Sequence, residues 1–139
     1  MKFLAIVALV LSMLVGGAAQ SQEAEAIAKA EAAAAQWLTL TDSANYAASW
    51  ERASGLFKTA VSKANWENAL RGVRTPLGAV KSRRLKSAQF TSSLPGAPDG
   101  EYVVIQFETQ FENKASAVET VTPQKDKDES WRVSGYYIK

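Results

Sequence analysis

The sequence predicts an α+β fold in which N-terminal helices pack on one face of a four-stranded antiparallel sheet. Before Leu77, apolar residues recur every three or four positions, which is the period of a helix with one buried face. From Val80 onward, apolar and polar residues alternate, which is typical of half-buried strands. The loops between these alternating segments are short, so consecutive strands are expected to pair antiparallel. Helices that precede such a sheet bury their apolar faces against it.

The first residues are expected to form a secretory signal peptide. A positively charged start, Met1-Lys2, precedes an apolar run over residues 3–15, and small residues follow at 16–19. A membrane anchor is the alternative, but the run is shorter than the roughly 20 residues that a spanning helix needs. We therefore expect cleavage after Ala19, a single α+β domain over residues 20–139, no membrane span after cleavage, and a periplasmic or secreted location.

Three helical stripes are expected before the sheet. They consist of Ile27, Ala30, Ala34, Trp37 and Thr41 in the first helix, Tyr46, Trp50, Ala53 and Phe57 in the second, and Trp66, Leu70, Val73 and Leu77 in the third. Ser54 and Gly55 loosen the second helix near its end. Pro76 is expected to push Thr75 out of helical geometry, and Gly78 completes the stop.

Four strands follow, and their alternation predicts which side chains face the helices. The strands are expected at Val80–Thr91, Glu101–Phe111, Ala115–Gln124 and Trp131–Ile138. In the second strand, Val103, Ile105, Phe107 and Phe111 would face the helices, and Tyr102, Val104, Gln106, Glu108 and Gln110 would face outward. The last strand is expected to add Arg132, Ser134 and Tyr136 to the outer face.

The composition excludes several kinds of chemistry. The 139 residues include neither cysteine nor histidine, and the net charge is +2. Without cysteine there is no disulfide and no thiol nucleophile, and without histidine the commonest general base and metal ligand are missing. A nearly neutral chain also has no electrostatic reason to bind nucleic acid. We expect no catalytic residue, no metal site and no cofactor.

Several segments resemble a bacterial family known only as domain of unknown function 4019. They are "AAAAQWLTLTDSANYAASWERAS", "WENALRGVRTPLG", "SLPGAPDGEYVVIQFETQFENKASAVETVTP" and "WRVSGYYI", which together span nearly the whole mature chain. The resemblance implies a cone-shaped fold similar to the nuclear transport factor 2 and cystatin-like superfamily, with helices cupped by a bent sheet. It implies no activity, because that superfamily contains isomerases, dehydratases, assembly modules and toxin-neutralising proteins.

Two alternative functions use the interior of such a cone. Isomerases of this superfamily pair an acid with a tyrosine in an apolar site, so an acid-only isomerase or dehydratase stays open. Here Glu108 points outward by parity, whereas the face of Glu119 is ambiguous. The other alternative is a carrier of a small apolar ligand, in a pocket lined by Trp37, Trp50, Trp66 and Phe107.

The basic stretch "KSRRLK", residues 81–86, also has two interpretations. It is either a patch for an anionic partner or a charged strand that discourages edge-to-edge pairing, and we favour the second.

The outer sheet face is the expected partner-binding surface. Tyr102, Gln106, Glu108, Arg132 and Tyr136 combine tyrosine and arginine with uncharged polar groups, a composition that is favoured at protein interfaces. An ordinary solvated sheet face is the alternative. We expect an exported, non-enzymatic module that binds and neutralises, or scaffolds, another envelope protein, as an immunity protein or inhibitor does. A homodimer through the sheet stays open.

Overall fold

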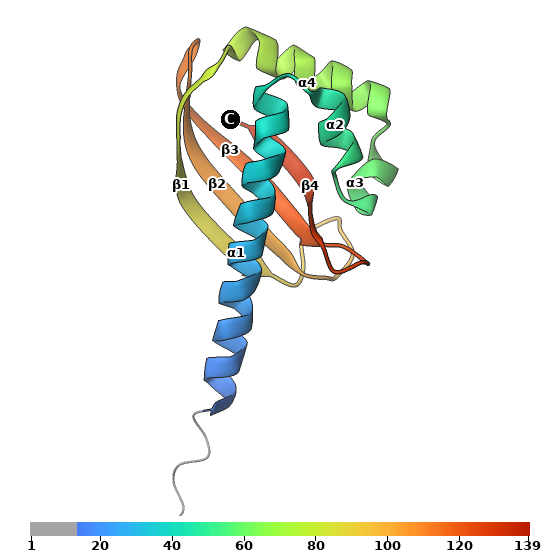
Figure 1. The fold of residues 1–139 in the computed structure, drawn as a ribbon, viewed down its shortest axis with the longest axis vertical. Helices are drawn as coiled ribbons and strands as arrows, with labels where there is room; N and C mark the ends of the chain where they lie inside the picture. The colour runs from blue at the N-terminus through green and yellow to red at the C-terminus, as the bar shows by residue number, and fades with distance from the viewer. Residues whose placement is uncertain (1–13) are drawn as a thin grey trace, which may run out of the picture.

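The computed structural model describes residues 14–139, and the larger part of the expected signal peptide lies outside them. The predicted α+β architecture is confirmed: four helices lie on one side of a four-stranded sheet (Figure 1). The elements are α1 (Leu14–Asp42), α2 (Tyr46–Glu51), α3 (Gly55–Ala60), α4 (Lys63–Leu77), β1 (Val80–Thr91), β2 (Tyr102–Phe111), β3 (Lys114–Lys125) and β4 (Trp131–Ile138). No helix within the described range is both long and apolar enough to cross a membrane.

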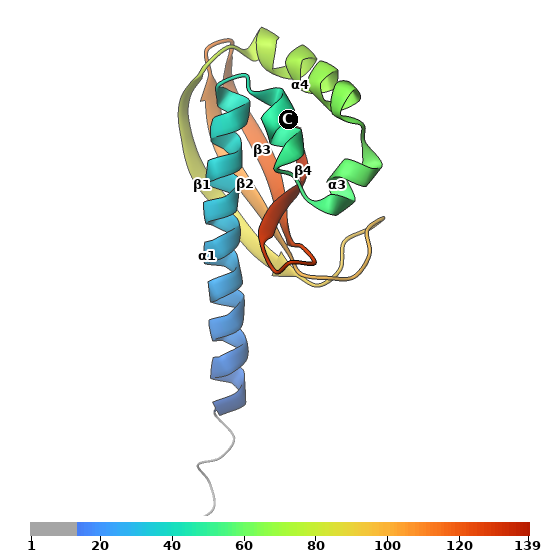
Figure 2. The same cartoon turned by 45° about the vertical axis from the view of Figure 1, so that its right-hand side comes forward.

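Helix α1 lies across the sheet, and its N-terminal part projects beyond it (Figures 1 and 2). The predicted stripe is confirmed, since Ala30, Ala34, Trp37 and Thr41 are buried. Alanine at two successive turns lets the helix backbone approach the strands closely, because a methyl group takes little space between them. Trp37 then supplies most of the bulk in the second half of the helix.

The predicted second helix is divided into α2 and α3. The break occurs at Ser54, whose hydroxyl accepts a hydrogen bond from the backbone N–H of Phe57 (3.1 Å) and so caps α3. The backbone N–H of Ser54 donates to the carbonyl of Val133 in β4 (2.9 Å). A helix running through this point would lose both bonds, so tertiary pairing with β4 overrides the helical pattern.

Two expectations for α4 are wrong. Thr75 is helical, and the helix continues past Pro76 to Leu77, where Gly78 ends it with a φ of 76°. A proline in the last turn deprives the helix of one hydrogen bond, and almost no helix follows it, so it is tolerated there. Val73 is 48% exposed, and Arg74 takes the buried position instead because it is held by an ion pair described below.

The sheet has the strand order β1-β2-β3-β4, and all neighbouring strands are antiparallel, as predicted. The two edges of the sheet are therefore β1 and β4. Each strand begins and ends within one residue of its predicted bounds. The side toward the helices carries a core of Ala30, Ala34, Trp37, Leu38, Val103, Ile105, Val121 and Val133.

The predicted inward face of β2 is confirmed, but the prediction that Tyr102 is exposed on the outer face is wrong. Val103, Ile105 and Phe111 are buried, and Phe107 packs half-buried against the core. Tyr102 is only 1% exposed. Its hydroxyl donates to the carbonyl of Pro98 (2.6 Å) because the loop between β1 and β2 folds back over the start of the strand.

The outward placement of Tyr136 is also wrong, and a β-bulge is the reason. Thr122 pairs with Gly135, but the next residue, Pro123, pairs with Val133, so β4 carries one extra residue at this point. Val133 and Tyr136 therefore both face the helices although they are three positions apart.

Two other β4 side chains that were expected on the outer face also lie elsewhere. Ser134 shares a hydrogen bond with Ser54 of the helical layer (2.6 Å), and Arg132 borders a groove beside α1, so neither belongs to the outer face as predicted. Tyr137, 53% exposed, is the tyrosine that faces outward.

Candidate functional site

Glu119 lies at the centre of the polar part of the interior. It is on β3 and its side chain is 0% exposed. Its Oε1 accepts hydrogen bonds from Arg83 Nε (2.7 Å) and the Thr109 hydroxyl, and its Oε2 accepts from Arg83 Nη2 (3.2 Å) and the Tyr136 hydroxyl. The two oxygens thus use all four of their lone-pair positions.

Asp42 extends this cluster to the end of α1. It accepts hydrogen bonds from Arg83 Nη1 and Nη2 (2.8 and 2.9 Å) and from Arg74 Nη2 (2.8 Å). Arg74 is 4% exposed, donates to the Thr41 hydroxyl (3.1 Å) and stacks over the Phe111 ring. We call Asp42, Arg74, Arg83, Thr109, Glu119 and Tyr136 the buried ion network. It joins α1, α4 and all four strands.

The protonation states of the network follow from its geometry. Burial alone would raise the pKa of Asp42, but the hydrogen bonds from Arg83 and Arg74 outweigh it and hold the pKa below its ordinary value. Burial, together with the neighbouring Glu119, raises the pKa of Tyr136. At neutral pH Asp42 is therefore an anion between two guanidinium groups, and the phenol of Tyr136 keeps the proton that it donates.

Sequence reasoning missed this network. An acid beside a tyrosine in the interior is the arrangement that an acid-only isomerase requires, and Glu119 with Tyr136 provides it. A general base, however, needs a free lone pair directed at substrate, and each oxygen of Glu119 already accepts two hydrogen bonds. The geometry thus favours a role in holding the strands and helices together.

The four aromatic residues expected to line a pocket pack in different places. Trp37 and Trp66 lie together in the core with ring centroids 6.2 Å apart. Trp50 instead donates from its indole to the carbonyl of Val61 (2.8 Å), and Phe107 packs against the sheet side of the core. Trp37, Trp66 and Phe107 therefore take part in core packing.

The predicted outer-face residues Gln106 and Glu108 do face outward. Gln106 is half-buried next to Ser87 and Thr120, at 3.5 Å from each hydroxyl. Glu108 forms an ion pair with Arg84 of the neighbouring strand β1. The hollow that Glu108 borders is open and spans β1, β2 and the start of β3. It is lined by Ser82, Arg83, Arg84, Lys86, Glu108, Thr109, Gln110, Ala115, Ser116, Ala117 and Val118.

Strand β1 forms a free, basic edge of this surface. It is the first strand in the sheet order, so β2 occupies only one of its two sides. Lys81, Arg84 and Lys86 are exposed, and Leu85 between them is 49% exposed. Arg83 alone among the basic residues of this stretch turns inward, to the buried ion network. The outer edge of β1 therefore offers unpaired backbone groups, positive charge and one large apolar side chain.

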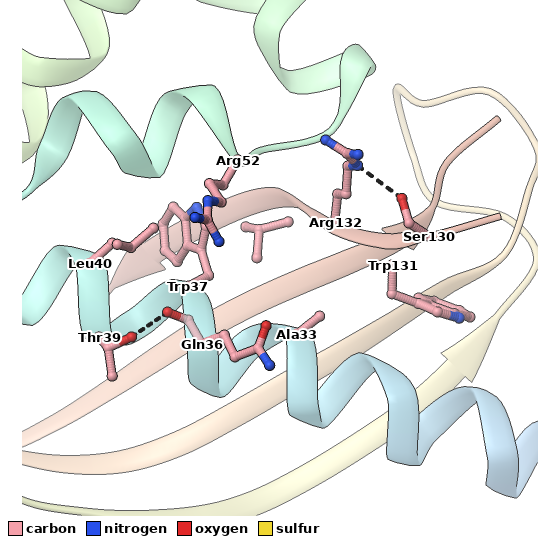
Figure 3. A pocket seen from close by; sticks show the side chains of 10 residues that line it. Ala33, Gln36, Trp37, Thr39, Leu40, Arg52, Ser130, Trp131 and Arg132 are labelled. Carbon is pink, nitrogen blue, oxygen red and sulfur yellow. Dashed lines mark hydrogen bonds between the residues drawn. The ribbon is translucent and has the colours of Figure 1, made fainter. Parts of the chain in front are cut away.

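A second hollow lies between α1 and β4 (Figure 3). It has a volume of about 450 Å³ and is lined by Ala33, Gln36, Trp37, Thr39, Leu40, Arg52, Ser130, Trp131, Arg132 and Val133. We call it the α1–β4 groove. Sequence reasoning did not find it, because Arg52 follows α2 and lines the same hollow as the β4 residues only once α2 and α3 fold onto β4.

Acidic groups in the β3–β4 turn have structural partners. Asp126 accepts a hydrogen bond from the backbone N–H of Gly55 (3.0 Å), which ties the turn to the start of α3. Asp128 accepts from Ser130 and forms an ion pair with Arg132 (3.2 Å). Within residues 14–139, no three acidic side chains come together in a way that could hold a metal ion.

Comparison with known proteins places the chain in one family. The family model described as "Protein of unknown function (DUF4019)" matches residues 33–136. The chain therefore belongs to this family, as its motifs indicate. No curated protein matches the chain, and no solved structure matches it either. The likeness to the nuclear transport factor 2 and cystatin-like superfamily accordingly stays a prediction.

Proposed function

We propose that this member of the DUF4019 family is a non-catalytic module that binds another protein, and that the partner adds an acidic, extended segment to the free edge of β1. In keeping with the expected export signal, the partner would be an envelope or secreted protein that the module neutralises or scaffolds. The observation that supports this proposal is the exposed edge of β1.

The backbone supplies the first part of the argument. A 12-residue strand at the edge of a sheet presents a row of unpaired N–H and C=O groups on its outer side. An extended peptide that pairs there satisfies these groups and gains affinity from main-chain hydrogen bonds. Side chains next to the strand then decide which peptide is accepted. Leu85 can contact an apolar side chain of the partner because half of its surface is exposed.

The charge of the strand selects the partner. Lys81 and Lys86 are exposed and have no carboxylate within ion-pair distance among the described residues, whereas Arg84 is paired with Glu108. Two copies of this protein that paired through β1 would bring these positive side chains against each other, which costs free energy. An acidic segment meets complementary charge instead, so we expect a different protein at this edge in preference to a second copy.

The buried ion network supports a scaffold role for the interior. It connects every strand to the C-terminal end of α1 or to α4 through charged hydrogen bonds. Such a network fixes the curvature of the sheet, and a fixed edge binds an added strand without the entropic cost of ordering itself.

The proposal is tested with an eight-residue peptide in which glutamate alternates with valine, titrated into the protein and followed by backbone amide resonances. We expect the amides of β1 to shift and the corresponding lysine–valine peptide to leave them unchanged. The double variant Lys81→Glu with Lys86→Glu should weaken binding by about tenfold or more, because it reverses the charge at the edge. Lys127→Glu with Lys139→Glu is the matched control, since Lys127 lies in the β3–β4 turn and Lys139 follows β4, the strand at the opposite edge of the sheet from β1.

Two results would overturn the proposal. One is equal binding of the acidic and basic peptides, which would mean that charge does not select the partner. The other is the absence of any β1 shift at peptide concentrations of about 1 mM, where even weak strand addition is visible.

A further inference from the structure

The α1–β4 groove is a binding site of a different kind, and it does not depend on the function proposed above. We infer that it binds a small amphiphilic carboxylate, with the carboxylate bound by Arg52, under the added positive charge of Arg132, and the hydrocarbon chain along α1. The inference rests on the charges at the groove, on the side chains beneath them and on the size of the space.

The two arginines supply the charge. The groove is lined by Arg52 and Arg132 and by no aspartate or glutamate. Arg52 is exposed, and within the described residues no hydrogen bond or ion pair holds its guanidinium group. Figure 3 shows Arg52 reaching from the segment after α2 down toward Trp37, and Arg132 standing farther along on β4. Two positive side chains in a lining that has no carboxylate make the potential of the hollow positive, which favours a bound anion.

Arg132 is pre-positioned for this role. Its Nε donates to the Ser130 hydroxyl (2.9 Å), and its Nη2 pairs with Asp128 (3.2 Å). These bonds hold the side chain in one orientation and leave Nη1 without a hydrogen-bond partner among the described residues. The side chain therefore keeps its positive charge at a fixed place beside the groove, where it adds to the attraction of an anion.

Part of the lining beneath the arginines is apolar. Trp37 and Val133 are buried there, and Ala33 and Leu40 add half-buried surface along α1. The indole N–H of Trp37 is used by the carbonyl of Ser49 (2.8 Å), so its ring presents only carbon to the groove. A ligand therefore meets positive charge and an apolar floor, with Gln36, Thr39 and Ser130 as polar side chains at its border.

The size of the groove indicates a small molecule. Its volume of about 450 Å³ falls within the range of small-molecule sites in proteins, about 300–1,000 Å³. The backbone N–H of Ser54 occupies the carbonyl of Val133 at this edge of the sheet, so an added β-strand would have to displace it. A peptide is therefore a poorer occupant than a single-chain carboxylate.

The inference is tested by isothermal titration calorimetry of the full chain with sodium decanoate, below its micelle-forming concentration. We expect saturable binding with one site. Decylamine has the same chain with the opposite charge, and acetate has the charge without the chain, so neither should bind. Arg52→Gln should weaken decanoate binding by about tenfold or more, because a charge-assisted hydrogen bond is lost.

Matched variants separate the groove from general charge effects. Arg84→Gln removes one positive charge from an exposed ion pair on β1 and should leave decanoate binding unchanged. Amide shifts at Val133 and Leu40 on decanoate addition would place the ligand in the groove. Equal binding of decanoate and decylamine, or equal effects of the Arg52 and Arg84 variants, would overturn the inference. So would the lack of any binding by the unmodified protein at about 1 mM decanoate.

Discussion

Glu119 shows how one residue can decide between a catalytic and a structural interpretation of the same interior. By alternation it shares a side of β3 with Ala117 and Val121, which are both buried. The sequence contained this signal, but Val118 and Thr120 on the other side are also compatible with burial, so the face could not be assigned. What settles its role is the number of hydrogen-bond donors around it, and these come from three other strands. No local pattern contains that information.

Glu119→Gln tests whether the residue stabilises the fold. The neutral amide cannot balance the charge of Arg83, and its NH₂ group would face a donor. Breaking a buried pair in this way costs about 3–5 kcal/mol, so the free energy of unfolding measured with urea should fall by that order. Glu108→Gln is the control, because its exposed pair with Arg84 contributes about 0–1 kcal/mol. Equal losses for the two variants would contradict the structural role of Glu119.

Asp42 makes the stability of the folded protein depend on pH in the acidic range. Its pKa is lowered in the folded protein, so its stabilising contribution is complete above its unfolded pKa of about 3.9 and is lost as the pH falls through the folded value. Unfolding by urea at a series of pH values should therefore show stability decreasing below about pH 4. In Asp42→Asn the slope of stability against pH below about pH 4 should be smaller. An unchanged slope would mean that the carboxylate does not interact with Arg74 and Arg83.

At the scale of elements, strand positions could be predicted well and strand faces less so. Alternation and short loops located all four strands, because both signals are local. The bulge in β4 reversed the predicted face of Tyr136 because it depends on pairing with β3. Pro123 was a signal that could have been used: it has no N–H to donate to the ladder, and bulges often occur where a proline interrupts pairing. Tyr102 was missed because a loop, which has no period, covers it.

The division between α2 and α3 makes a testable prediction at the same scale. Ser54→Ala removes the N-cap of α3 and the hydrogen bond to Ser134, both of which are buried or half-buried. We expect a loss of about 1–2 kcal/mol in the free energy of unfolding. Ser62→Ala removes the equivalent cap of the longer α4, which is exposed, and should cost less. If the order of the two losses were reversed, packing of α3 on β4 would not depend on Ser54.

At the scale of the whole molecule, we propose that the buried ion network holds the sheet in shape and that the free edge of β1 receives a partner. The network is on the inside and the basic edge is outside, and Arg83 and Arg84 are neighbours that point to opposite sides of the strand. This separation lets β1 present positive charge outward while Arg83 stays paired with Glu119 inside. It also predicts that binding at β1 leaves the interior unchanged.

The most direct measurement is an NMR structure of the protein with the bound glutamate–valine peptide. The account predicts backbone-to-backbone contacts between the peptide and residues 81–86, so that the peptide forms a fifth strand beside β1, with no change at Glu119. Contacts from the peptide to β4 or to the helices, with none to β1, would contradict it.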